Sequence, residues 1–398
     1  MILSTKATCI CPSSTLVIDA KAKKMKAEGI DVISFGAGEP DFDTPEHIKN
    51  AAIKAINEGF TKYTPASGTA ELKRAVCEKL KKDNNLDYSA SNIVISNGAK
   101  HSLANAFFAI CNPGDEVIIP GPYWVSYPEM VKMADGIPVV VNAAEQDGFK
   151  VGIRQIEKAA TNKTKAIVLN SPNNPTGMVY SPSELKEIAD FAVSKKLFII
   201  SDEIYEKLIY DGCEHVSIAS LDYMVKDYTI VINGVSKTYS MTGWRIGYSA
   251  SNAKIAEVMA NVQSHATSNP NSIAQKAAEA AIKSSKDIIE NMVIAFNNRR
   301  DYMVKRINSI KGISCIKPNG AFYVMMNISN YIGKEIDNTK ISGSDDFADI
   351  ALEKAKIALV PGSGFGIDTH VRLSYATSME NITEGLNRIE ALVEKVVF

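Results

Sequence analysis

The sequence predicts an α/β fold in which a mostly parallel sheet is covered by helices and is followed by a smaller α/β domain. Short apolar runs alternate with amphipathic helical segments between about residues 93 and 250, a pattern typical of parallel strands joined by crossover helices. The chain of 398 residues is also longer than a single hydrophobic core usually supports, so a second domain is expected.

Seven apolar runs are predicted as the strands of one sheet, because each is short and rich in β-branched residues. They lie at 93–96, 116–119, 138–142, 166–170, 197–201, 228–232 and 246–249. Helical segments at 100–110 and 184–194 lie between them, and the second begins after Ser181 and Pro182, a typical helix start. We expect right-handed crossovers between the parallel strands.

The pattern changes beyond about residue 252, where a long helical region between 282 and 310 is expected to leave the sheet. A smaller domain follows, with strands expected at 321–326, 357–361 and 370–375 and a helix at 344–356. The turn-rich segment 36–41 separates an N-terminal arm, which we expect to pack on that smaller domain. The predicted division is 43–285 for the large domain, and 1–42 with 286–398 for the arm and the smaller domain.

The composition favours a cytoplasmic protein that acts on small molecules. A net charge of −1 gives no basic surface for nucleic acid, and no apolar run has the roughly 18 residues of a membrane span. Six scattered cysteines and the lack of a secretory signal indicate a reducing compartment. Cys9 and Cys11 lie close together, but no second Cys/His pair follows at ligand spacing, so no metal site is expected.

Two cations follow the predicted strand at 228–232. Lys237 comes directly after the turn at Asn233 and Gly234, and Arg245 lies eight residues further on. The carboxyl ends of parallel strands are where α/β proteins place their chemistry. A desolvated lysine loses part of its proton affinity and can attack a carbonyl group, whereas an arginine suits a phosphate. This segment therefore predicts a nucleophilic amine beside an anion site.

Four other segments have the composition of ligand-binding turns. A glycine turn at 96–100 opens a helix, whose free amides would bind an anion. The segment 170–177 ends a strand in a rigid turn rich in Asn and Pro, and 201–205 brings Asp202 and Tyr205 to the same sheet edge. In 370–375, Arg372 alternates with apolar neighbours and is expected to point into a cleft between the domains.

Together these segments resemble the class I aminotransferases that bind pyridoxal 5′-phosphate, with the fold-type-I architecture. The resemblance covers nearly the whole chain, from the Gly-Ala-Gly-Glu-Pro-Asp-Phe segment at 36–42 through Lys62 and Tyr63 and the Asn-Asn-Pro-Thr-Gly turn at 173–177 to Arg372. It is strongest for the bacterial-type aspartate aminotransferase subgroup. The family has one large domain with a seven-stranded sheet and a smaller α/β domain, and it forms homodimers that share active sites.

The resemblance assigns a role to each candidate residue. Lys237 would bind the cofactor covalently and move the substrate Cα proton, and Asp202 would pair with the pyridine nitrogen and make the ring an electron sink. The other implied contacts are Tyr205 and Asn174 at the ring oxygen, Trp124 on the ring face, Arg245 with the backbone amides of Gly98, Ala99 and Lys100 at the phosphate, and Tyr63 from the partner subunit. Arg372 would bind the substrate α-carboxylate as a fork, with Gly38, Trp124 and Asn174 beside the substrate.

The resemblance also bears on substrate choice. Lys100, together with Thr15 in the N-terminal arm, matches the residues with which this subgroup recognises a second carboxylate, so L-aspartate and 2-oxoglutarate are the expected substrates. One alternative is that prephenate is the main or the second substrate. Another is that the enzyme acts more broadly on alanine or aromatic amino acids, which applies if Lys100 is merely solvated. A lyase or decarboxylase and a non-catalytic amino-acid sensor are further alternatives on the same fold.

One position departs from the family pattern. Many members carry a serine three residues before the reactive lysine as a phosphate ligand, and Gly234 stands there in this chain. The phosphate is therefore expected to lose one hydroxyl contact unless Ser236 replaces it.

Overall fold

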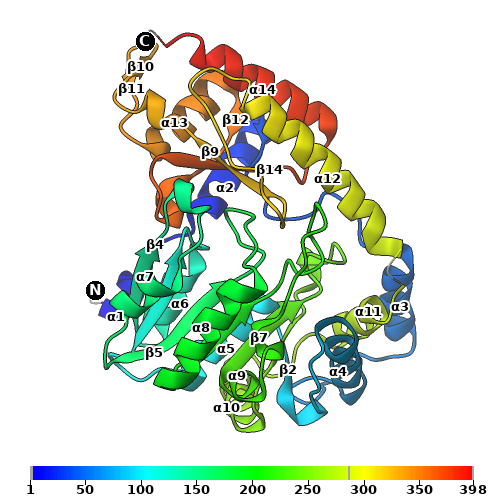
Figure 1. The fold of residues 1–398 in the computed structure, drawn as a ribbon. Coiled ribbons are helices and arrows are strands. Elements are labelled where there is room, and N and C mark those ends of the chain that lie inside the picture. The colour runs from blue at the N-terminus through cyan, green and yellow to red at the C-terminus, as the bar shows by residue number, and fades with distance from the viewer. Residues whose placement is uncertain (1–2, 286, 397–398) are drawn as a thin grey trace.

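A seven-stranded sheet organises the lower part of the molecule in Figure 1. The computed structural model describes residues 3–285 and 287–396. The strand order is β2-β8-β7-β6-β5-β3-β4, in which β8 runs antiparallel to both neighbours and the pairs from β7 to β4 are parallel. The strands are β2 (Ile93–Ser96), β3 (Glu116–Gly121), β4 (Ile137–Asn142), β5 (Thr164–Asn170), β6 (Phe198–Asp202), β7 (Thr229–Gly234) and β8 (Gly247–Ala250). The seven predicted strands and the mostly parallel sheet are confirmed.

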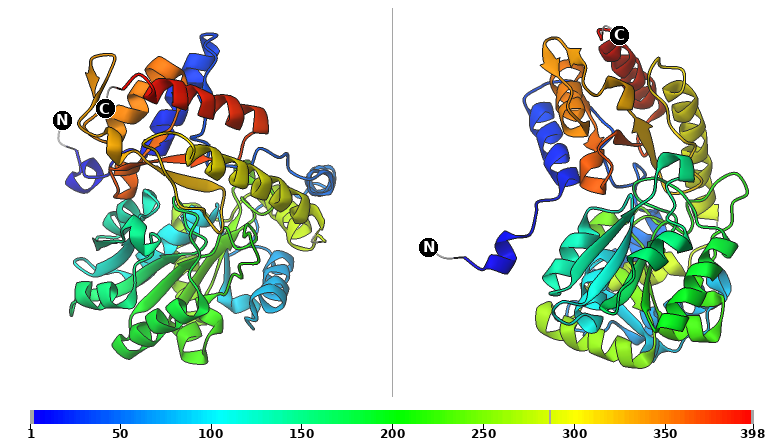
Figure 2. Two further views of the ribbon diagram at one scale, coloured as in Figure 1. Left: turned by 45° about the horizontal axis from the view of Figure 1, so that its top comes forward. Right: turned by 60° about the vertical axis from the view of Figure 1, so that its left-hand side comes forward.

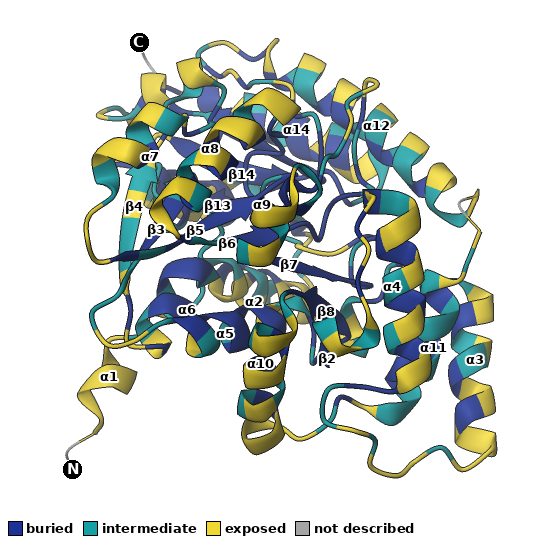
Figure 3. Ribbon diagram, turned by 60° about the horizontal axis from the view of Figure 1, so that its bottom comes forward, coloured by how far each residue is buried: buried dark blue, intermediate teal, exposed yellow. Residues whose placement is uncertain are grey.

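Helices cover both faces of this sheet because its central strands are apolar on both sides. In β3, Val117 and Ile119 pack with one layer of helices, whereas Ile118 packs with the opposite layer. The first layer is α5 (Ala99–Ile110), α6 (Ser126–Met133) and α10 (Ala253–Ala266), and the second is α7 (Ile153–Ala159), α8 (Pro182–Lys195) and α9 (Tyr223–Tyr228). Figure 3 shows the central strands buried between helices whose outer faces are exposed, whereas the edge strand β4 is only partly buried. Such a continuous apolar strand is typical of a sheet buried on two faces.

A group of three helices extends the sheet part beside β2. These helices are α3 (Glu46–Asn57), α4 (Ala70–Asn84) and α11 (Ser272–Ile282). Their small and branched side chains pack together with Ile93 and Ile95 of β2 in one hydrophobic cluster. Beyond α11, the long helix α12 (Asp287–Ile307) rises from this region to the upper part of the molecule, as Figure 1 shows.

The upper part has its own core around a three-stranded antiparallel sheet with the order β13-β14-β9. Its elements are β9 (Tyr323–Asn327), β10 (Glu335–Ile336), β11 (Thr339–Lys340), α13 (Ser344–Ile350), β12 (Ile357–Ala358), β13 (Val360–Pro361), β14 (His370–Ser374) and α14 (Met379–Val393). The N-terminal arm carries α1 (Thr5–Thr8), α2 (Ser14–Ala27) and β1 (Ile33–Ser34), and β1 pairs with β12. The right-hand view of Figure 2 shows α2 against the upper part while α1 extends away from it.

Two details of the upper part differ from the sequence prediction. The single strand expected at 357–361 is wrong: the chain forms β12, which pairs with β1, and then β13, which pairs with β14. The fully buried Leu359 lies between them, at the point where the chain passes from one sheet to the other. The small hairpin of β10 and β11 was not predicted, because its strands have two residues each and no apolar run.

The boundaries predicted for the two domains remain a prediction. The seven-stranded sheet lies between residues 93 and 250, inside the proposed large domain. Residue 286, at which the second boundary was set, lies outside the described residues, as do residues 1–2 and 397–398.

Candidate active site

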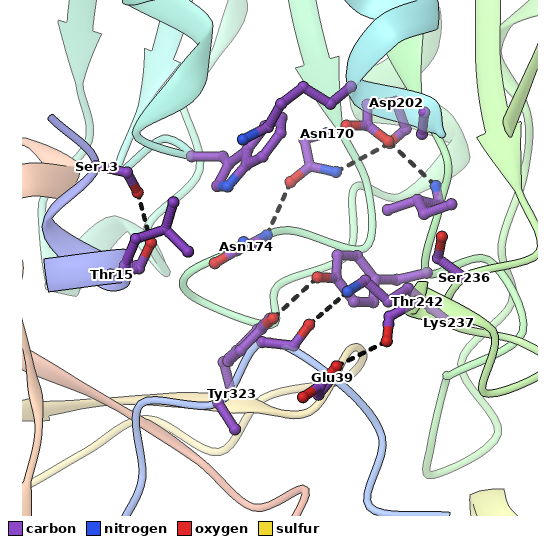
Figure 4. A pocket seen from close by; sticks show the side chains of 18 of the residues that line it. Ser13, Thr15, Glu39, Asn170, Asn174, Asp202, Ser236, Lys237, Thr242 and Tyr323 are labelled. Carbon is purple, nitrogen blue, oxygen red and sulfur yellow. Dashed lines mark hydrogen bonds between the residues drawn. The ribbon is translucent and has the colours of Figure 1, made fainter. Parts of the chain in front are cut away.

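A cavity of about 450 Å³ lies between the carboxyl edge of the large sheet and the strands β9 and β14. Side chains from both parts of the molecule line it, as the close-up in Figure 4 shows. Of the residues singled out in the sequence, the cavity lining includes Thr15, Gly38, Ala99, Lys100, Trp124, Asn174, Asp202, Tyr205, Lys237, Arg245 and Arg372. Segments that are far apart in the sequence therefore meet at one site.

Lys237 follows β7 on a short turn and extends its amine into the cavity. The amine donates a hydrogen bond to the backbone carbonyl of Gly38, from the N-terminal arm. Burial lowers the pKa of Lys237 to about 8, with Glu39 opposing this shift and the positive charges of Arg245 and Arg372 adding to it. A larger fraction of this amine is therefore neutral near pH 7 than of an ordinary lysine, which suits a nucleophile or general base.

Asp202 is the last residue of β6 and lies on the same side of the cavity as Lys237. One carboxylate oxygen accepts a hydrogen bond from the Tyr127 hydroxyl at 2.7 Å, and the other accepts one from the backbone amide of Ile204 at 3.2 Å. Burial raises the pKa of Asp202 to about 6, while these two hydrogen bonds act in the opposite direction. The side chain is 4 % exposed, so this carboxylate needs a polar or cationic partner from the cavity side.

The glycine turn after β2 packs directly against Arg245. Gly98 has φ +86°, and a Cβ atom there would lie 2.3 Å from Nη2 of Arg245. Arg245 itself has φ +57° and donates to the backbone carbonyls of Thr242 at 3.0 Å and Asn97 at 3.3 Å. A glycine is required at 98 for both its backbone conformation and its lack of a side chain. The start of α5 and a guanidinium group thus meet at one end of the cavity, an arrangement that suits an anion.

The structure gives a packing reason for Gly234. A Cβ atom at this position would lie 2.9 Å from the Cα of Gly247 and 3.0 Å from the carbonyl oxygen of Ile246. The close contact between β7 and β8 therefore leaves no room for a serine side chain here. Ser236, two residues further on, lines the cavity, and its role toward a phosphate stays a prediction.

Arg372 on β14 enters the cavity from the opposite side. Its Nη1 donates to Oδ1 of Asn174 and its Nη2 to the carbonyl of Gly36, both at 3.0 Å. The guanidinium lies 4.3 Å from the ring centre of Tyr323 and 5.1 Å from that of Phe365. Nε is buried and has no hydrogen-bond partner among the described residues. This buried, oriented cation suits a carboxylate ligand.

Two tyrosines at the site were not found from the sequence. The Tyr127 hydroxyl bonds Asp202, and the Tyr323 hydroxyl lies 3.0 Å from that of Tyr205. Tyr127 lies three residues after Trp124, at the start of α6, and the spacing alone did not distinguish it from a core residue. Tyr323 lies in β9, which was predicted as a strand, but only the tertiary structure brings it to Tyr205.

The two residues expected to recognise a second carboxylate, Lys100 and Thr15, both line the cavity. Nζ of Lys100 lies 4.9 Å from the ring centre of Trp124, and burial, with Arg245, lowers the pKa of Lys100. The Thr15 hydroxyl is 2.7 Å from that of Ser13. Tyr63, in contrast, is 91 % exposed and is not part of the cavity lining in the described chain. A site that uses Tyr63 must take it from another copy of the chain.

A second cluster of titratable groups follows Asp202 in the sequence and is not part of the cavity lining. Ligand atoms of Glu203, Glu206 and His215 lie within 4.8 Å of one another. The amine of Lys79 contacts Glu206, and Nε2 of His215 lies 3.2 Å from Glu203. The protein thus supplies Lys79 as a cationic partner for Glu206, and His215 with the hydroxyls of Ser201 and Ser217 as hydrogen-bonding partners for Glu203.

The fold is that of an α/β protein. Its cavity contains Lys237, whose pKa is lowered, together with a helix start suited to an anion and the buried Arg372. Residues 30–389 match the family model of the class I and II aminotransferases. The chain belongs to this family, and the predicted architecture, with its large sheet and smaller α/β part, is that of its fold-type-I members.

Three relatives illustrate the similarity. The aspartate aminotransferase of Bacillus sp. (strain YM-2) is 49 % identical over 393 residues, with 99 % of each chain covered. The aspartate/prephenate aminotransferase of Nitrosomonas europaea is 46 % identical over 398 residues, covering 99 % of this chain and 100 % of the other. The crystal structure of the aspartate aminotransferase from Rhizobium meliloti superimposes with a TM-score of 0.96 at 41 % identity, and all of both chains is covered.

In the part of the chain that the structure describes, no helix has both the length and the apolar composition needed to cross a bilayer.

Proposed function

We propose that this protein is an aspartate aminotransferase that uses pyridoxal 5′-phosphate to move the amino group of L-aspartate to 2-oxoglutarate, giving oxaloacetate and L-glutamate in a ping-pong reaction. The observation that carries this proposal is the placement of two further cations, Arg372 and Lys100, around the cavity that holds Lys237. A dicarboxylic substrate needs one cation for each carboxylate. The relatives named for aspartate support the same substrate.

The donor set of the cavity fits pyridoxal 5′-phosphate. Its volume of about 450 Å³ lies within the usual range of small-molecule sites. Arg245 and the backbone amides of Gly98, Ala99 and Lys100 form an end suited to the phosphate, and Asp202 offers a buried carboxylate for the ring nitrogen. Trp124, Tyr205 and Asn174 line the space between these two ends. When bound, this cofactor supplies an electron-withdrawing aldehyde that carries the amino group between the two half-reactions.

In this proposal, the residues of the chain bind, orient and move protons. Lys237 would hold the cofactor covalently and, as a neutral amine, would take the proton from the substrate Cα. Arg372, with Asn174 beside it, would bind the substrate α-carboxylate. This contact would orient the substrate so that its Cα–H bond faces Lys237. Lys100, whose Nζ lies 4.9 Å from the ring centre of Trp124, would bind the distal carboxylate, and Gly38, which accepts a hydrogen bond from Lys237, would lie beside the substrate.

The remaining features of the proposal concern assembly and location. Tyr63 would complete the site of a partner subunit in a homodimer, because its side chain is almost fully exposed in the single chain. A cytoplasmic location agrees with the scattered free cysteines. Prephenate amination is a second candidate activity, since the similarity to the Nitrosomonas enzyme covers both chains almost completely.

Steady-state kinetics with a panel of substrates test this function. The purified protein should show a visible absorption band after incubation with pyridoxal 5′-phosphate, and Lys237→Ala should abolish it, whereas the exposed control variant Lys254→Ala should keep it. With aspartate and 2-oxoglutarate, one glutamate should form for each aspartate consumed. Consumption of aspartate without glutamate would indicate a lyase or decarboxylase, and a higher kcat/KM for prephenate than for oxaloacetate or 2-oxoglutarate would favour the second candidate.

A further inference from the structure

Tyr127 connects two sides of the proposed cofactor site. It lies at the start of α6, and its hydroxyl donates a 2.7 Å hydrogen bond to one carboxylate oxygen of Asp202. The Tyr127 ring meets the Trp124 ring edge to face, with 5.3 Å between centres and 84° between planes. One buried side chain, 2 % exposed, therefore contacts both the residue expected on the cofactor's ring face and the residue expected at its ring nitrogen.

The hydrogen bond restricts what Asp202 can do. With one oxygen bonded to Tyr127 and the other to the amide of Ile204, the carboxylate cannot rotate without losing a buried hydrogen bond. Both donors also favour the ionised carboxylate over the neutral acid. We propose that Tyr127 is a positioning residue, which holds Asp202 ionised and correctly oriented to pair with the ring nitrogen of the cofactor. This inference rests on the proposed function.

Four charged or titratable groups interact electrostatically with Asp202. Tyr127 faces it from α6, Glu203 and Tyr205 belong to its own segment, and Lys237 faces it from the turn after β7. Burial raises the pKa of Asp202 to about 6, Tyr127 and Lys237 lower it, and Glu203 raises it. Burial also holds the pKa of Tyr127 well above its usual value, so this phenol stays a donor throughout the accessible pH range.

Binding of pyridoxamine 5′-phosphate to the cofactor-free full-length protein tests the inference without turnover. This form of the cofactor has an amine in place of the aldehyde, so it does not react with Lys237. Its affinity, measured by fluorescence titration between pH 5 and pH 8.5, should fall as the pH drops through the pKa of Asp202. In Tyr127→Phe the fall should begin about one pH unit higher, because the ionised acid has lost a hydrogen bond. Near pH 8.5, where the carboxyl is ionised in both proteins, only the smaller loss that comes from its orientation should remain.

Three further variants separate positioning from packing. Tyr123→Phe removes a phenol from the segment just before α6 and should reproduce the wild-type profile. Asp202→Asn should remove the part of the pH dependence that comes from this carboxyl, and adding Tyr127→Phe to it should have no further effect. Thermal unfolding of every variant checks that each is folded at the pH of the titration.

The outcomes distinguish this inference from the proposed function. A binding profile that Tyr127→Phe does not shift along the pH axis, or an equal loss in the Asp202→Asn background, would overturn the proposed role of Tyr127 while leaving the aminotransferase proposal intact. Failure of the wild-type protein to bind either form of the cofactor at any pH would overturn the proposed function itself.

Discussion

Arg372 on β14 donates a 3.0 Å hydrogen bond to the side chain of Asn174, which lies 198 residues earlier in the chain at the turn after β5. The contact joins the upper part of the molecule to the edge of the large sheet. Because Arg372 also donates to Gly36 of the N-terminal arm, three separate segments hold one guanidinium group. A substrate carboxylate would meet a cation that is already oriented, so little ordering is needed on binding.

Arg372→Lys should raise the KM for both aspartate and 2-oxoglutarate. Lysine keeps the charge but loses the planar fork, and each lost charge-assisted hydrogen bond costs about 1.5 to 3 kcal/mol, or roughly tenfold to 150-fold in affinity. Steady-state kinetics with each substrate measure this change. Arg306→Lys, at a surface ion pair with Glu390, is the control and should stay close to wild type. Unchanged KM values for both substrates would contradict the role of Arg372.

Covalent capture of pyridoxal 5′-phosphate by the cofactor-free protein should depend on pH through Lys237. Only the neutral amine attacks a carbonyl, and the pKa of Lys237 is lowered to about 8. The rate should therefore rise about tenfold per pH unit below pH 8 and level off above it, whereas an ordinary lysine would keep rising to about pH 10.4. Stopped-flow absorbance measures this rate. If the rate continued to rise beyond pH 9, this would contradict the lowering of the Lys237 pKa by burial.

Lys100→Ala should reduce kcat/KM for aspartate far more than for alanine or phenylalanine. The lost cation is expected to pair with the distal carboxylate, which alanine and phenylalanine lack, so a selective loss of about tenfold or more is expected. The ratio of kcat/KM values for the three amino donors is the measurement. Equal losses for all three would assign Lys100 to the cofactor phosphate or to packing against Trp124 instead.

Mixed dimers should recover activity if Tyr63 serves the partner's site. Lys237→Ala and Tyr63→Ala would each inactivate or weaken every site of their own homodimer. A heterodimer of the two contains one site with both wild-type residues, so random reassociation of equal amounts should give about a quarter of wild-type activity. Unfolding and refolding the mixed chains, followed by an activity assay, tests this. Activity equal to the average of the two parents would mean that Tyr63 acts elsewhere.

Lys79→Met should destabilise the fold without touching the cavity. The buried Lys79 amine contacts Glu206, which also accepts a 2.7 Å hydrogen bond from Asn84. Leaving this carboxylate unpaired should cost about 3 to 5 kcal/mol of unfolding free energy, measured by urea denaturation at pH 7. Adding Glu206→Gln should recover part of the loss, because the unpaired charge is then removed. A double variant as unstable as Lys79→Met would argue for a packing defect.

The contribution of the Lys79–Glu206 pair to the free energy of unfolding should decrease as the pH falls. Burial opposes ionisation of Glu206, but the charges of Lys79, His215 and Lys207 dominate and lower its pKa to about 2. An unfolded glutamate titrates near pH 4.3. This pair therefore contributes its full stability above about pH 4.3 and loses it as the pH falls toward 2. In Lys79→Met, the decrease in stability between pH 5 and pH 3 should be smaller than in the wild type.

The sequence alone determined the local order of the chain and most of the candidate site. The apolar runs predicted the positions of the seven strands, because a strand that is buried on both faces is a continuous apolar run in the sequence. Lys237, Asp202, Asn174 and Arg372 were found because they stand at strand ends or alternate with apolar neighbours. The same reasoning wrongly predicted a single strand at 357–361. The chain passes there from one sheet to another, and an apolar segment contains no residue that indicates such a change.

Only the tertiary structure decided which side chains meet across the chain. Tyr127 reaches Asp202 and Tyr323 reaches Tyr205 through contacts between residues 75 and 118 positions apart, and local periodicity carries no information on such pairs. The exclusion of a side chain at Gly234 likewise depends on the distance to β8. Strand positions follow from short-range hydrophobic patterning, whereas the pKa values and orientations that govern chemistry follow from burial and hydrogen bonds that exist only after the two parts have packed together.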